Sequence, residues 1–261
     1  MKRIALSVFI LLFVTGCAAT FQEKRDLSKP MVSIAMGKIA NNDIQGALLE
    51  LRRAQRANPE DPEIFYGFAL AYWKSDRPES ALEHIDKAIA LSDRLGLEHP
   101  GLKSEAFNLK GTILTGMDSY EEALSSFEEA LKDELYATPE YPLYNMSFIH
   151  LSSKRYEQAI ETATQALDHN PHYAPAWEML GKIFAQQGKD AQAIEAFKHA
   201  ILEFPGYVEA HWEIAQLYIR IGETEQGISH LNEVIRVDPG GAFSGMAVQR
   251  LQDLGKTPQT N

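Results

Sequence analysis

A small residue recurs at near-constant spacing along this chain, each time within a helical pattern of apolar residues. The six positions are Ala47, Ala81, Ala123, Ala159, Ala193 and Gly227. The intervals between them are 34, 42, 36, 34 and 34 residues. A small residue at a helix crossing lets two helices pack closely, so this period predicts an array of helix pairs. In such an array each pair buries its apolar face only against its neighbours.

The repeat is clearest in Ala174–Tyr207. One face of its two helices carries small and aromatic residues: Trp177, Leu180, Gly181, Phe184, Ala193, Phe197 and Ala200. Pro205 ends the unit, because it has no amide hydrogen with which to continue a helix. The pattern resembles the tetratricopeptide repeat (TPR), whose consensus is W-x2-L-G-x2-Y, A-x3-F-x2-A and P. The resemblance implies an all-α, right-handed superhelical solenoid of about six helix pairs.

The other units match the same pattern with substitutions. They begin near Ser28, Pro62, Ser104, Glu140 and Val208. The array is therefore expected over 28–241, and 242–261 is expected to form a capping helix and a polar tail, since terminal repeats need a polar outer face. The spacing departs from the period in one place, where eight extra residues lie around 93–101 between the second and third units.

The first residues have the pattern of an export signal. Met1-Lys2-Arg3 is basic, and Ile4–Val14 is apolar but too short to span a bilayer. Val14-Thr15-Gly16-Cys17 resembles the bacterial lipobox, which is cleaved before a cysteine that receives lipid, and Cys17 is the single cysteine of the chain. We interpret 1–16 as a lipoprotein signal peptide and 17–27 as a lipidated cysteine, with palmitate among its acyl chains, followed by a polar tether. A secretory peptide with an unrelated cysteine and an uncleaved anchor are the alternatives.

In lipoproteins of this kind the residue after the cysteine influences sorting. Ala18 stands there, where an Asp tends to retain the protein in the inner membrane. The resemblance therefore implies a lipid anchor in the outer membrane, with the repeats facing the periplasm.

The composition and motifs disfavour several functions. The formal net charge is −11, and it becomes −13 when cleavage removes Lys2 and Arg3, so neither nucleic acid nor anionic headgroups are expected partners. No phosphate-binding, nucleophile-elbow or zinc-protease motif occurs. His169 and His172 flank a turn at Pro171 without a third ligand at metal spacing, which indicates a surface turn. We expect no enzyme, no metal, no cofactor and no small-molecule substrate.

In the tetratricopeptide family the concave wall is formed by positions 2, 5, 9 and 12 of each first helix. Carried onto this chain, those positions give candidates for a partner-binding groove: Tyr66, Leu70, Trp73, Asn108, Thr112, Tyr141, Tyr144, Phe148 and Trp212. They also give Val32, Met36, Ile39, Thr115, Leu151 and Ile219. Aromatic residues on a face that the repeat does not bury suggest a docking surface, unless irregular packing or a tight superhelix covers them. Tyr141, Tyr144 and Phe148 share one helix face and are the favoured anchor.

A short segment indicates a particular group of tetratricopeptide repeat proteins. Leu135-Tyr136-Ala137-Thr138-Pro139, running into Leu143-Tyr144-Asn145, resembles the TPR lipoproteins of type IV pilus biogenesis, the PilW/PilF/Tgl group. A lipobox followed by about six repeats fits the same group. The resemblance implies a pilotin, a lipoprotein that binds the pilus secretin and promotes its multimerisation and insertion in the outer membrane. The lipid would supply membrane affinity while the groove holds an apolar segment of the secretin.

Two other functions remain alternatives. A TPR lipoprotein that scaffolds cell-wall hydrolases or outer-membrane protein assembly would have the same fold and anchor, and would differ only in its partner. A peptidoglycan-active enzyme would need a cleft with a nucleophile or paired acids, and no motif for one occurs.

Overall fold

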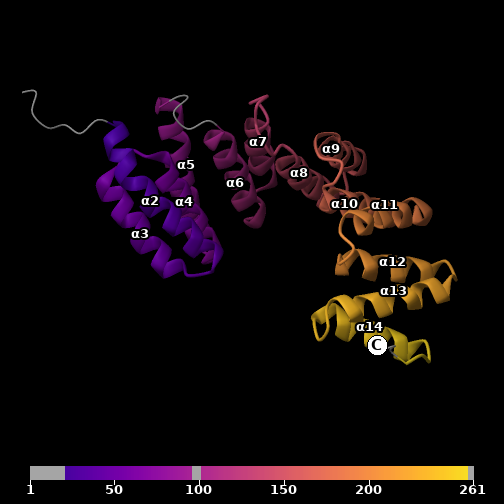
Figure 1. The fold of residues 1–261 in the computed structure, drawn as a ribbon. Coiled ribbons are helices and arrows are strands. Elements are labelled where there is room, and N and C mark those ends of the chain that lie inside the picture. The colour runs from indigo at the N-terminus through magenta and orange to yellow at the C-terminus, as the bar shows by residue number, and fades with distance from the viewer. Residues whose placement is uncertain (1–20, 96–100, 258–261) are drawn as a thin grey trace, which may run out of the picture. The chain divides into compact units, whose positions relative to one another are not determined.

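The computed structural model describes residues 21–95 and 101–257, so the expectations for the signal peptide and for Cys17 concern residues outside these ranges. Over the described residues the chain forms thirteen α-helices and no strand, which confirms the predicted all-α repeat array. The chain divides into two compact units, residues 1–117 and 118–261. Helices alternate in direction within each unit (Figure 1).

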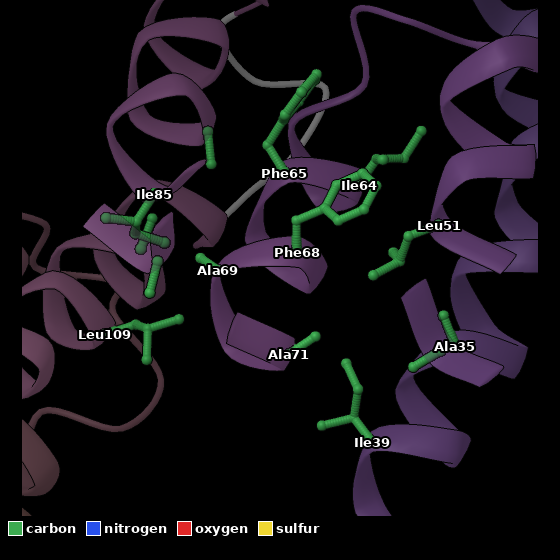
Figure 2. Packing of buried hydrophobic residues seen from close by; sticks show 14 of the residues in the cluster. Ala35, Ile39, Leu51, Ile64, Phe65, Phe68, Ala69, Ala71, Ile85 and Leu109 are labelled. Carbon is green, nitrogen blue, oxygen red and sulfur yellow. The ribbon is translucent and has the colours of Figure 1, made fainter. Parts of the chain in front are cut away.

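The first unit contains five helices. They are α2 (Phe21–Ala40), α3 (Ile44–Ala57), α4 (Pro62–Lys74), α5 (Pro78–Leu95) and α6 (Leu102–Gly116). Helices α2 and α3 form one antiparallel pair and α4 and α5 the next. Figure 2 shows how Phe65 and Phe68 of α4 lie among aliphatic side chains of the neighbouring helices. Phe65 is fully buried, so this aromatic pair anchors the core of the unit.

Helix α2 begins inside the segment that was expected to be a tether. It starts at Phe21, and Ser28 is buried, with its hydroxyl 3.1 Å from Asp61 Oδ2. Arg25 lies 3.3 Å from Glu63 at the start of α4. The polar composition suggested a tether, but these polar groups bind the next helix pair. The ordered array therefore extends on the N-terminal side of the boundary expected at residue 28.

The second unit contains eight helices. They are α7 (Tyr120–Ala130), α8 (Glu140–Ser152), α9 (Tyr156–His169), α10 (Ala174–Gln186), α11 (Asp190–Glu203), α12 (Val208–Arg220), α13 (Thr224–Val237) and α14 (Ala242–Asp253). The packed pairs are α8 with α9, α10 with α11, and α12 with α13. Helix α14 packs against α13 and buries Ala247 and Leu251 at the end of the array.

The helix crossings depend on the small residues of the repeat. A Cβ atom added at Gly181 would lie 2.7 Å from the Phe197 ring, and one at Gly227 would lie 2.6 Å from Ile219 Cγ1. Both distances are shorter than side chains tolerate in a packed core. Gly181 is therefore confirmed as a crossing residue between α10 and α11.

Each turn inside a repeat contains one residue in the left-handed conformation. These residues have φ between 56° and 88°, and they are Asn42, Asp76, Asp118, Lys154, Gly188 and Gly222. Each stands five residues before a recurring small residue of the sequence. Glycine, Asn and Asp adopt this conformation most readily. Lys154 is the exception, and there the Arg155 amide donates to the carbonyl of His150 at 2.8 Å, as the tight turn requires.

Candidate protein-binding face

The first helices α8, α10 and α12 of the second unit together present a face of aromatic and charged side chains. We call it the first-helix face and define it by Tyr141, Tyr144, Phe148, Tyr173, Glu178, Lys182, Tyr207 and Glu213. Ring contacts, a hydrogen bond, an ion pair and electrostatic interactions connect these residues, except Phe148, which follows Tyr144 one turn later in α8. It lies wholly within one compact unit.

The α8 part of this face is aromatic and partly open to solvent. Tyr141 and Phe148 each keep 43% of their surface exposed. Tyr144 lies between them in the helix but is more deeply packed, and burial raises its pKa to about 12. Tyr173, which precedes α10, meets both tyrosines edge-on, with ring centroids 5.5 Å from Tyr141 and 5.8 Å from Tyr144. Edge-to-face contacts of this kind fix the ring orientations.

The α10 part contains a buried carboxylate. Glu178 is only 3% exposed, and it forms an ion pair with Lys182 one turn later in the helix. Tyr207, at the start of α12, donates a hydrogen bond to the same carboxylate. Burial, followed by the nearby Glu178 charge, raises the pKa of the Tyr207 hydroxyl, so it stays a donor over the physiological range. The charge of Glu178 is thus satisfied within the face.

The α12 part carries a second carboxylate with different surroundings. Glu213 is half-buried near Lys182 and Glu178, and burial raises its pKa above the ordinary value. Over residues 21–95 and 101–257, Glu213 has no ion-pair partner: Lys182 pairs with Glu178, and Arg220 pairs with Asp190 of α11. Glu213 is therefore a partly desolvated carboxylate whose nearest cations, Lys182 and Arg220, form their ion pairs with other acids.

The groove candidates of the first unit are packed more closely than expected. Tyr66 and Leu70 lie partly buried against its core, and burial raises the pKa of Tyr66 to about 12. Trp73 packs on α6, where a Cβ added at Gly116 would lie 2.3 Å from the indole. Val32 and Ile39 are core residues, and Met36 is partly buried beside them. The assignment of Val32 and Ile39 to an open groove was wrong, because the adjoining helices bury them, whereas Trp73 is partly buried.

Position 12 of the repeat shows why some of the family's concave-wall positions do not form an open groove in this chain. Leu151 is buried in the core between α8 and its neighbours, and Ile219 packs against Gly227 of α13. Residues at this position stand near the end of the first helix, where the second helix of the pair returns. Their side chains therefore belong to the helix packing and not to a binding surface.

The remaining candidates have separate environments. The Thr112 hydroxyl donates to the carbonyl of Asn108 at 3.0 Å, within its own helix. Trp212 lies 6.2 Å from the Phe243 ring and lines a hollow of about 510 Å³ between α12 and α14, together with Met246. The structure therefore brings together Tyr141, Tyr144 and Phe148, while Trp212 belongs to the adjoining C-terminal pair.

Sequence reasoning missed the polar half of the first-helix face. Glu178 and Lys182 occupy positions 5 and 9 of the fifth unit, so the rule that selected Tyr144 and Phe148 also selects them. Tyr173 and Tyr207 are 34 residues apart and each precedes a first helix, which the period alone could have revealed. Both tyrosines lie in the turns before the helices, outside the helical positions that define the concave wall.

Two further sequence expectations concern the lipid and the histidines. Cys17 lies outside the described residues. Within the part of the chain that the structure describes, no helix is both long and apolar enough to cross a bilayer. His172 lies in the turn between α9 and α10, where its Nδ1 is 2.8 Å from Glu203 Oε2. Its partner is thus a carboxylate of the following repeat, and His169 is exposed.

Paired helices with small residues at each crossing define a helical-repeat protein. Three family models described as "Tetratricopeptide repeat" match the chain. The first matches residues 33–94 and 149–208, the second residues 185–247, and the third residues 104–132. The chain is a tetratricopeptide repeat protein, in a family of protein-interaction scaffolds that are typically non-enzymatic. These matches cover both compact units.

Two solved structures resemble the chain over nearly their whole length. The structure of pilF from Pseudomonas aeruginosa aligns with a TM-score of 0.73 at 18% identity, covering 88% of this chain and 99% of its own. The structure of PilW, titled a widely conserved type IV pilus biogenesis factor, has a TM-score of 0.73 at 18% identity, covering 84% and 97%. A MamA structure covers 69% of this chain with a TM-score of 0.54. These likenesses establish the fold.

Curated relatives match over shorter stretches. The photosystem I assembly protein Ycf3 of Synechococcus sp. (strain CC9902) is 40% identical over 74 residues, which are 28% of this chain and 43% of Ycf3. Anaphase-promoting complex subunit 7 of Dictyostelium discoideum is 26% identical over 136 residues, which are 52% of this chain and 22% of the subunit. The chain thus spans less than half of either protein.

Proposed function

We propose that this chain is a lipid-anchored adaptor of the outer membrane that promotes assembly of the type IV pilus secretin, as a pilotin does. The observation that carries the proposal is the extent of the structural likeness to pilF and PilW. Those structures cover 88% and 84% of this chain at a TM-score of 0.73, whereas the MamA structure covers 69% at 0.54. The similarity therefore extends over most of the repeat array.

The mechanism we propose is physical and requires no reaction. Lipid on Cys17 would hold the repeats at the membrane surface, and the first-helix face would bind an apolar segment of the unassembled secretin. Confinement to a surface raises the effective concentration of the bound subunits and so favours their multimerisation. Lipoproteins with more than one acyl chain are anchored stably enough for this role.

The exposed aromatic residues of α8 supply the contact surface. Tyr141 and Phe148 are held at fixed positions on a helix, so little conformational entropy is lost when a partner covers them. Large aromatic side chains are also the commonest anchors of protein interfaces. Tyr173 packs edge-on against Tyr141 and Tyr144 and so holds both rings in place.

The test is secretin assembly in cells that carry altered forms of this chain. We expect Tyr141→Ser combined with Phe148→Ser to reduce secretin multimers on denaturing gels, while the variant stays folded and membrane-bound. Leu202→Ser is the matched control, because Leu202 is 72% exposed on α11, the second helix of its pair. It removes a similar apolar surface away from the first-helix face.

Three outcomes separate the alternatives. Loss of multimers in the double variant alone supports the proposal. Normal multimers in cells that lack the chain would refute a role in secretin assembly. Normal multimers together with co-purification of cell-wall hydrolases or outer-membrane protein assembly factors would favour the scaffold function instead.

A further inference from the structure

The first-helix face combines an aromatic area with a carboxylate that forms no ion pair within the described residues. Tyr141 and Phe148 expose apolar surface on α8, and Glu213 keeps a half-buried carboxylate on α12. Between them Glu178 is paired with Lys182 and bonded to Tyr207, so its charge is already satisfied. The remaining acid, Glu209, is exposed at the start of α12 and adds to the negative potential.

The cations near Glu213 are committed elsewhere. Lys182 pairs with Glu178, and Arg220 holds Asp190 with two nitrogens, its Nε lying 3.1 Å from Asp190 Oδ2. A partly desolvated carboxylate is costly without a partner, and it gains most from a ligand that brings a positive charge. The site is therefore complementary to a lysine or arginine side chain.

We propose that the first-helix face binds an extended segment of another protein through a lysine or arginine that pairs with Glu213, while apolar side chains of the same segment cover Tyr141 and Phe148. This inference rests on the proposed function, in which the face binds protein, and it specifies the chemistry of the bound segment.

The helix spacing sets the distance between the two contacts. Helix α8 packs on α10, and Glu213 of α12 lies near Glu178 and Lys182 of α10, so the two contacts are about two helix spacings, or about 16–20 Å, apart. An extended chain rises about 3.3 Å per residue, so five or six residues span that distance. The basic residue is thus expected about five or six positions from the apolar residues that meet α8.

The test uses random 12-residue peptides displayed on phage and selected on the purified full chain. We expect the bound peptides to be enriched in Lys or Arg at that distance from an apolar pair. Affinities of the best peptide are then measured by fluorescence anisotropy against the wild type and variants. We expect Glu213→Gln to weaken binding about tenfold, as loss of a hydrogen-bonded charge pair predicts.

Two controls make the result specific. Glu161→Gln removes one negative charge from the exposed surface of α9, a second helix, and we expect it to leave the affinity unchanged. A peptide whose basic residue is replaced by norleucine should lose the same tenfold on the wild type and nothing further on Glu213→Gln. The peptide change involves no alteration of the protein, so the pairing can be tested even where the variant folds poorly.

The outcomes distinguish this inference from the function on which it rests. The proposed pairing would be overturned if peptide affinity depended on Tyr141 and Phe148 but was the same for Glu213→Gln and the wild type. That result would leave the protein-binding face intact. Peptides that do not depend on Tyr141 and Phe148 would overturn the face itself. Selected sequences without basic residues would also refute the pairing.

Discussion

The turn at Lys154 is strained in a way that one substitution should relieve. Lys154 has φ of 56°, while the equivalent turn residues are Asn, Asp or Gly. A residue with a side chain in the left-handed region costs about 1–2 kcal/mol relative to the right-handed one. Glycine avoids this cost, although it gives up about 0.5–1 kcal/mol because its unfolded chain is more flexible. We therefore expect Lys154→Gly to raise the free energy of unfolding by about 0.5–1 kcal/mol.

In the part of the chain that the structure describes, the side chain of Lys154 makes no polar contact whose loss would offset the gain in backbone conformation. Its side chain is exposed, and within the described residues it forms no ion pair or side-chain hydrogen bond. Its amide donates to the carbonyl of Leu151 at 2.9 Å, and glycine keeps that bond. In a unit of this size the change corresponds to an increase in melting temperature of about 1–4 °C.

Urea denaturation followed by circular dichroism would measure the effect, with Lys154→Ala as the control. Alanine removes the long side chain but keeps the Cβ atom, so it should not stabilise the turn. The reciprocal change, Gly188→Ala, should cost about 1 kcal/mol, because φ at this position is 71°. No atom of the described residues lies within 4 Å of the new methyl group, so the cost would come from backbone strain and not from a clash. Equal stability of Lys154→Gly and Lys154→Ala would refute the argument from backbone strain.

Three other predictions concern the core, the anchor and a histidine pair. Gly181→Leu should push α10 away from Phe197 and cost about 1–3 kcal/mol or more in urea denaturation, and unchanged stability would contradict the crossing geometry. Cys17→Ser should leave the melting temperature unchanged but release the protein from outer-membrane fractions; retention there would contradict lipidation. Burial lowers the pKa of His230 to about 4, and its Nδ1 lies 3.0 Å from His211 Nδ1. Because His230 binds its proton more tightly in the unfolded state, the free energy of unfolding should fall as the pH drops from about 6.5 towards 4. The expected loss is about 2 kcal/mol for a partly exposed ring. Denaturation at pH 7 and pH 5 would measure it, and His230→Gln should lose this pH dependence.

The period predicted the backbone of this chain because packing repeats with it. The small residues at the helix crossings, such as Gly181, have no freedom to vary without separating the helices, so they mark each pair in the sequence. The turn residues follow the same spacing for the same reason. Helices, turns and crossings were therefore accessible from the sequence.

The surface exposure of individual residues was less accessible. Trp73 has the composition of a binding residue, but it fills the space left by Gly116 on the neighbouring helix. That contact joins two repeats, and the helical pattern of one repeat contains no information about it. The early start of α2 was missed for a similar reason, because Ser28 is polar yet buried through its bond to Asp61 of the next pair.

The first-helix face shows how a repeat array acquires specificity. Tyr144, Glu178 and Trp212 stand 34 residues apart at the same position of three successive repeats, so the fold places three different chemistries at equivalent sites. Glu178 is 3% exposed, and Lys182 and Tyr207 stabilise its charge. That carboxylate is therefore part of the architecture of the face. Glu213, one residue beyond the equivalent position in α12, lacks such partners within the described chain, and it is consequently the group whose charge a bound segment can complete.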